Sequence, residues 1–102
     1  MHQLSEHRDE SIEMRLRIQR TAEPGVIIAI AWEGGYMTPG QGWATRFMPW
    51  AALRGHLAEM IHVPARMLER AEKSFTSGRN FDIPITTRAS QLQQMGFERQ
   101  TA

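Results

Sequence analysis

The fold is decided by residues 12–32, which read IEMRLRIQRTAEPGVIIAIAW. In residues 12–19, apolar side chains alternate with charged or polar ones, which is the period-two pattern of a half-buried strand. Residues 26–32 are apolar throughout, rich in β-branched side chains and bounded by turn residues, which also favours a strand. Pro24 and Gly25 suit the two central positions of a type II turn. The stretch therefore predicts an antiparallel hairpin.

The second strand of this hairpin has two unequal faces. Its even-numbered positions carry Val, Ile, Ile and Trp, whereas its odd-numbered positions begin with one Ile followed by two Ala. A large face beside a small face indicates a central strand with close neighbours on both sides. We expect the large face to be the main core.

The chain after the hairpin begins with a loop. Residues 34–42 hold four Gly and one Pro, which predicts irregular structure. Residues 43–48 then read as a third strand, which completes a meander.

Two amphipathic helices follow. Apolar residues recur at spacings of three and four from Trp50 to Ile61 and again from Met67 to Phe75. Pro49 and Pro64 suit the first turns of these helices, where a missing N–H costs nothing. A single helix over residues 50–76, kinked at Pro64, is the alternative.

The last third of the chain returns to the sheet. Ser77 and Gly78 end the helical region, and the alternation from Phe81 to Ile85 predicts a strand that Pro84 confines to an edge. Thr87 is expected to cap a short final helix that ends at Gly96.

These elements give the order β-β-β-α-α-β-α, which is an α+β fold. We expect a small antiparallel sheet, made of a three-strand meander and an edge strand, with two or three helices packed on one face. Residues 11–97 form the single domain in this interpretation. Residues 1–10 and 98–102 are expected to be flexible tails.

Composition excludes several classes of protein. The 102 residues contain no Cys, so disulfides, thiolate metal sites and a Cys nucleophile are ruled out. Twelve Lys and Arg balance eleven Asp and Glu, so no overall field favours nucleic acid or anionic lipid. The longest apolar run is too short to span a membrane, and the polar N-terminus does not resemble a signal peptide. We expect a soluble, cytoplasmic, bacterial protein without a membrane partner.

The loop and its aromatic neighbours form the preferred contact surface. Tyr36 and Met37 lie within the loop, and Trp43 follows it. Exposed aromatic and Met side chains are typical of protein interfaces. We therefore expect a non-enzymatic binding or regulatory module that contacts another protein, or itself, through residues 34–43.

A DNA-binding regulator is the alternative. Residues 54–73 resemble the helix-turn-helix motif of repressors, in which the second helix reads the DNA groove. The resemblance implies that Arg66 and Arg70 contact bases while Arg54 and Lys73 contact the phosphate backbone. His62 occupies the turn position where the motif usually has Gly, and the segment is nearly neutral, both of which weaken the match. The positions that carry the resemblance are Ala58, Ile61, Val63, Leu68 and Ala71.

Catalytic and metal-binding constellations are missing from the sequence. His56, Glu59 and His62 do not converge on one helix face, so no metal site is predicted. No Ser lies in a nucleophile-elbow context, and the Gly-rich loop lacks the ending of a phosphate-binding loop. We therefore expect neither catalytic residues nor a cofactor, although a small hydrolase or ligand carrier stays open as a third class.

Overall fold

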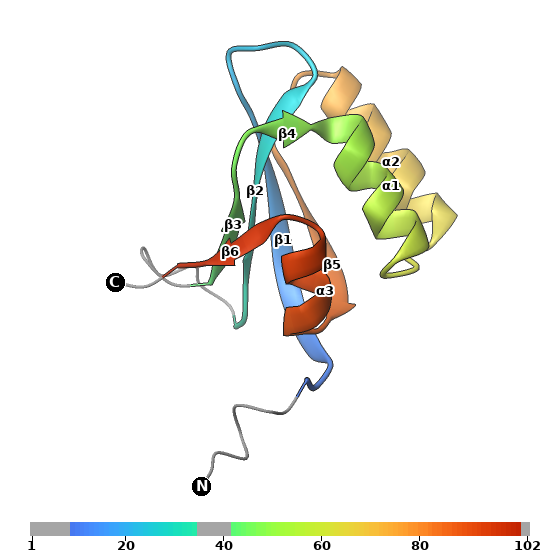
Figure 1. Cartoon of the computed structure of the whole chain (residues 1–102). Helices are drawn as coiled ribbons and strands as arrows, with labels where there is room; N and C mark the ends of the chain where they lie inside the picture. The colour runs from blue at the N-terminus through green and yellow to red at the C-terminus, as the bar shows by residue number, and fades with distance from the viewer. Residues whose placement is uncertain (1–8, 35–41, 101–102) are drawn as a thin grey trace, which may run out of the picture.

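The structure is a computed structural model that describes residues 9–34 and 42–100. These residues form a six-stranded antiparallel sheet and three helices, which confirms the predicted α+β class (Figure 1). The strand order is β5-β1-β2-β3-β6, and β4 also pairs with β2. The elements are β1 (Ile12–Arg20), β2 (Val26–Trp32), β3 (Trp43–Thr45), β4 (Met48–Pro49), α1 (Trp50–Glu59), α2 (Ala65–Thr76), β5 (Phe81–Thr87), α3 (Ala89–Gln94) and β6 (Phe97–Arg99).

The predicted hairpin is confirmed. β1 and β2 pair in an antiparallel register that runs from Arg15 opposite Trp32 to Arg20 opposite Ile27. In the turn, the Val26 N–H donates to the Glu23 carbonyl at 3.1 Å, and Gly25 has φ 80°. A positive φ at the third turn position is what a type II turn requires.

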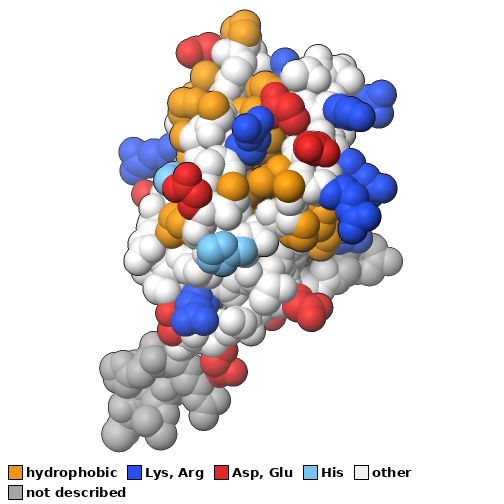
Figure 2. Space-filling view, turned by 90° about the vertical axis from the view of Figure 1, so that its right-hand side faces the viewer, with side chains coloured by type: hydrophobic (Ala, Val, Ile, Leu, Met, Phe, Trp, Pro, Cys, Tyr) orange, Lys and Arg blue, Asp and Glu red, His pale blue; other side chains and the backbone are white. Residues whose placement is uncertain are grey.

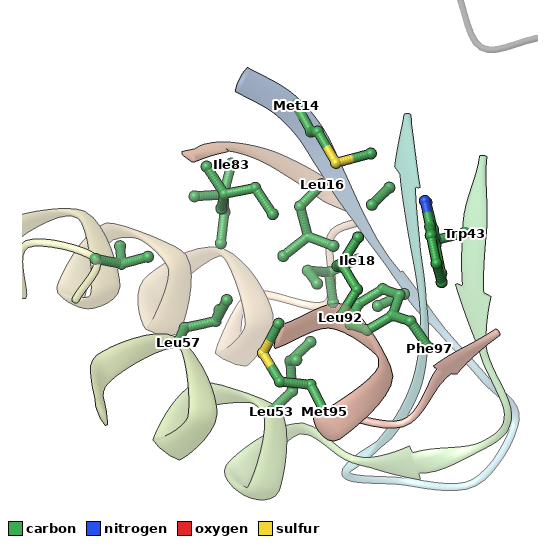
Figure 3. Packing of buried hydrophobic residues seen from close by; sticks show 14 of the residues in the cluster. Met14, Leu16, Ile18, Trp43, Leu53, Leu57, Ile83, Leu92, Met95 and Phe97 are labelled. Carbon is green, nitrogen blue, oxygen red and sulfur yellow. The ribbon is translucent and has the colours of Figure 1, made fainter. Parts of the chain in front are cut away.

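The prediction for the faces of β2 is wrong. The side chains of Ile27, Ala29 and Ala31 are fully buried in the core, whereas the other face of β2 is only half-buried from Val26 to Ile30. Side-chain volume explains why the small face of β2 is the one that is buried. Large side chains from β1 and the helices, such as Leu16 and Leu53, fill the core, and the two small residues of β2 leave room for them (Figure 3). All three helices bury apolar side chains in this one core.

The predicted third strand is interrupted by a β-bulge. The register against β2 shifts by one residue between β3, where Ala44 lies opposite Ile30, and β4, where Met48 lies opposite Ile27. Arg46 and Phe47 therefore share the single position opposite Ile28. At the bulge, the backbone N–H of Ala29 donates to the buried Thr45 Oγ1 at 3.0 Å, which satisfies a group that the regular ladder would otherwise pair.

The segment after β4 forms two helices and not one kinked helix. The start of α1 lies against the end of α2, because the Trp50 ring stacks on Phe75 with a centroid distance of 5.5 Å. The Trp50 Nε1–H also donates to Glu72 Oε1 at 2.8 Å. The helices therefore run side by side in opposite directions, as Figure 1 shows. This arrangement is a helical hairpin that covers one face of the sheet.

The structure differs from three predictions for α3 and for the residues near the chain ends. Arg88, not Thr87, is the N-cap residue of α3, and its side chain makes no capping bond. Asp9, expected in a loose tail, instead accepts hydrogen bonds from the backbone N–H and the hydroxyl of Ser90 in the first turn of α3. Glu98 was also expected in a tail but belongs to β6, because Phe97 is buried and anchors that strand against β3.

Candidate functional site

Of the three predicted partner-binding residues, Trp43 is the one that the structure describes. Its side chain is only 7% exposed, and its ring belongs to the core with the Arg99 guanidinium 5.5 Å from the ring centroid. Little of this ring is therefore open to a partner. Tyr36 and Met37 lie outside the described residues, so their part in a contact surface stays a prediction.

Among the predicted DNA contacts, Arg54 is already engaged. Its Nη1 donates to Glu72 Oε1 at 3.0 Å, the same oxygen that accepts the Trp50 indole N–H. These two hydrogen bonds hold the pKa of Glu72 below its ordinary value, with the Trp50 bond the larger cause. The Glu72 carboxylate thus joins α1 to α2, and Arg54 contributes to the hairpin instead of projecting freely.

The other three predicted DNA contacts lie on the surface of α2. Arg66, Arg70 and Lys73 are exposed, and within the described part of the chain none of them has an ion-pair partner. Figure 2 shows Lys and Arg side chains along one flank of the helical face, beside apolar side chains in its middle. Exposed Glu69 lies between the two arginines and reduces the local positive charge.

The turn between the helices has the backbone that the helix-turn-helix resemblance requires. His62 has φ 60° and is the one non-Gly residue with positive φ in the described ranges. His62 thus adopts the left-handed conformation for which Gly is usual. The helix arrangement differs from the motif, however, because helix-turn-helix helices cross steeply, whereas α1 and α2 run antiparallel.

A groove between α2 and the edge strand β5 is a prominent concave feature of the described residues. It consists of two adjoining hollows of about 640 Å³ and about 260 Å³, which share Met67 and Pro84 as lining residues. We call this feature the α2–β5 groove. The larger hollow reaches the α1–α2 turn and Gly34, where the predicted contact loop begins.

The walls of the groove are apolar and its ends carry charge. Side chains from α2 and β5 that pack partly on the core, such as Met67 and Ile83, line it. The remaining apolar lining residues are Met14, Ile61, Val63, Pro64, Ala71, Phe81, Pro84 and Ile85. Concave sites with apolar walls and a few polar groups are the usual form of binding sites.

The charges along the groove are not balanced. Asp82 is neutralised by a bidentate pair with Arg17, in which Nε donates to Oδ1 at 2.8 Å and Nη2 donates to Oδ2 at 3.1 Å. This pair lowers the pKa of Asp82 and raises that of Arg17. The remaining Arg and Glu residues that line the groove are Arg70, Arg15 and Glu13. Two positive charges are therefore set against one negative charge. The groove therefore presents a small excess of positive charge.

β5 contributes a free strand edge to the groove. It lies at the end of the strand order, so within the described residues its outer edge has no strand partner. Pro84 lies opposite Arg15 of β1 in the middle of this edge, and proline is tolerated in a sheet where its missing N–H faces away from the neighbouring strand. The outer edge of β5 therefore lacks one backbone N–H donor at its centre.

Sequence reasoning missed this groove, because its walls come from α2, the sheet and the α1–α2 turn, which only tertiary packing brings together. The one available signal was Pro84, which correctly placed β5 at an edge. No cluster of His, Asp and Glu suited to a metal ion occurs among the described residues. No helix in the described ranges is long and apolar enough to cross a membrane.

The comparisons with known proteins add no further information about the site. No family model, curated protein or solved structure matches the chain.

Proposed function

We propose that the protein is a non-enzymatic binding module that holds an extended segment of another protein in the α2–β5 groove. The observation that carries this proposal is that two adjoining hollows, which share Met67 and Pro84 as lining residues, follow β5. A groove that follows a strand suits an extended chain better than a compact ligand. The excess of Arg over acidic residues along the groove favours a segment with apolar side chains and flanking carboxylates.

The predicted contact loop fits this proposal at one end. Gly34 lines the groove, so a segment lying there would approach the point where the predicted contact loop begins. The loop and the groove are therefore two parts of one proposed surface, and they can be separated by experiment.

The proposal is tested by selecting peptides from a random phage-displayed library and measuring their binding as synthetic peptides. We expect enrichment of apolar sequences with Asp or Glu. Arg70→Glu should weaken their binding by on the order of tenfold, because it reverses the charge beside the groove. Arg66→Glu is the matched control, since it reverses an exposed charge on the same helix but does not line the groove.

The position of the bound peptide is read from the methyl signals of methionine. Met67 reports on the groove and Met37 on the loop. Peptides that shift Met67 and lose affinity on Arg70→Glu support the groove. Peptides that shift Met37 alone, or bind the two charge variants equally, contradict the groove as the binding site.

A second candidate, DNA binding by α2, is favoured by the exposed and unpaired Arg66, Arg70 and Lys73. It predicts retention on heparin at low salt and a steep loss of DNA affinity as salt rises. The double variant Arg66→Ala and Arg70→Ala should lose this retention. If wild-type protein passes through heparin unretained, the DNA hypothesis is rejected.

A further inference from the structure

The face of the sheet opposite the helices carries a half-buried apolar stripe, which ends at the buried Trp32. It runs along β2 through the half-buried side chains of Val26, Ile28 and Ile30, and Ala44 of β3 lies beside Ile30 in register. We call this surface the outer face. All three helices contribute their buried side chains to the core on the other side of the sheet, so no described helix packs on it.

The bulge adds an exposed aromatic ring to the outer face. Thr45 and Met48 on either side of it belong to the core side, so Arg46 and Phe47 both project on the side of Ile28. Phe47 is 70% exposed and is the one large hydrophobic residue classed as exposed in the described ranges. A ring presented in this way, beside an apolar stripe, is typical of a contact surface.

The charges that border the outer face fit a second copy of the same face. On one flank, Arg17 and Asp82 form a closed bidentate pair. On the other, Arg46 and Glu98 are 3.6 Å apart with side chains 86% and 62% exposed, so their pairing is weak and easily exchanged. A two-fold interface requires a self-complementary patch, and one Arg beside one Glu provides it.

The size of the surface also suits a small symmetric interface. At about 4.8 Å per strand and 3.3 Å per residue, the 31 residues of the six strands cover roughly 500 Å². A standard specific interface takes about 800 Å² from each partner. The net charge of +1 opposes the approach of two copies very little.

We propose that the outer face is the interface of a weak, two-fold symmetric homodimer. Phe47 lies near the two-fold axis and packs on the apolar stripe of the other copy. Arg46 of each copy pairs with Glu98 of the other. Phe47, Arg46 and Glu98, on which this interface depends, do not line the α2–β5 groove, so either proposal can fail while the other stands.

The first test measures molar mass by analytical ultracentrifugation over a concentration series. Wild-type protein should approach twice the 11.7 kDa of one chain as concentration rises. Phe47→Thr keeps a strand-forming residue but removes the ring, and it should raise the dissociation constant by on the order of tenfold or more. At a concentration at which both proteins are monomeric, the variant should keep the wild-type melting temperature because Phe47 is exposed, and this controls for misfolding.

The second test uses charge reversal and distinguishes a pair between copies from a pair within one copy. Arg46→Glu leaves two carboxylates at the patch, and Glu98→Arg leaves two guanidinium groups, so each variant alone should be monomeric. An equimolar mixture should form a heterodimer, because every contact between copies is then attractive. Arg66→Glu, in the helical layer, is the matched control and should dimerise like the wild type. The proposal is overturned if wild-type protein stays monomeric throughout, if Phe47→Thr dimerises unchanged, or if the mixture stays monomeric.

Discussion

At the scale of single residues, three tryptophans show how one side-chain type takes different roles. Trp50 is buried and donates its indole N–H to Glu72, while Trp43 packs in the core below Arg99. Trp32 is also buried, but its Nε1–H has no hydrogen-bond partner among the residues that the structure describes. An unpaired buried donor is destabilising, whereas a paired one contributes to stability.

This difference predicts the outcome of replacing each ring with the smaller one of phenylalanine. Trp50→Phe loses ring volume and the bond to Glu72, whereas Trp32→Phe loses volume but removes an unpaired donor. We expect Trp50→Phe to reduce the free energy of unfolding by about 1–2 kcal/mol more than Trp32→Phe. Urea denaturation of the two variants measures the difference. Equal losses would show that the Trp50–Glu72 bond contributes no net stability.

The backbone of His62 leads to a second prediction at this scale. Its φ of 60° is unfavourable for a residue with a Cβ, and its side chain is exposed. His62→Gly should therefore stabilise the protein by about 0.5–1 kcal/mol in thermal or urea unfolding. Gly78→Ala is the reverse control, because φ is 80° and the space for a Cβ is open. It should destabilise, and a His62→Gly variant that also destabilises would contradict the strain argument.

At the scale of elements, the contact between α1 and α2 depends on the charge of Glu72. The pKa of Glu72 is lowered in the folded protein, mainly by the Trp50 bond and then by Arg54. A carboxyl group with a lowered folded pKa contributes stability above its unfolded pKa, and this contribution is lost as pH falls through the folded value. The contact between α1 and α2 should therefore weaken in acid.

We expect Glu72→Gln to be less stable than the wild type at neutral pH and the two to converge as pH falls below the ordinary glutamate range. Urea denaturation at a series of pH values tests this. Glu69→Gln on the same helix is the matched control, because Glu69 is exposed and hydrogen bonds to neither Trp50 nor Arg54. A stability difference between wild type and Glu72→Gln that does not shrink in acid would contradict the assignment.

Sequence reasoning predicted the individual strands and helices better than any other feature. Periodicity and turn chemistry predicted β1, β2, both long helices and β5, because those signals are local. The core face of β2 was mistaken, since side-chain size on one strand does not reveal which face the helices cover. β6 was missed because three residues carry no period, and its pairing with β3, a strand distant in the sequence, is a tertiary contact.

The candidate sites could be predicted less well than the fold. Arg66 and Arg70 were correctly expected on the surface of α2, because helical spacing fixes which residues share a face. The α2–β5 groove and the exposure of Phe47 depend on tertiary packing and on a bulge. Neither leaves a periodic trace in the sequence.

At the scale of the whole molecule, the short last strand closes the core. Phe97 is 2% exposed and packs in the same cluster as residues of β1 and α1. Phe97→Ala should reduce the free energy of unfolding by about 3–4 kcal/mol, a large share of the stability of a small domain. Glu98→Ala on the same strand should cost less than about 0.5 kcal/mol, because its pair is solvent-exposed. Similar losses in the two variants, measured in urea, would show that β6 does not anchor the core.

The two edge strands of the sheet limit how far this protein can polymerise. One end is β5, where Pro84 withholds a donor, and the other is β6, with only three residues. Both ends are poor templates for adding strands from other molecules, which is the route to fibrils. Dimerisation through the outer face, in contrast, buries that face of both copies in a single step. A protein built in this way can form pairs at high concentration and still resist open-ended aggregation.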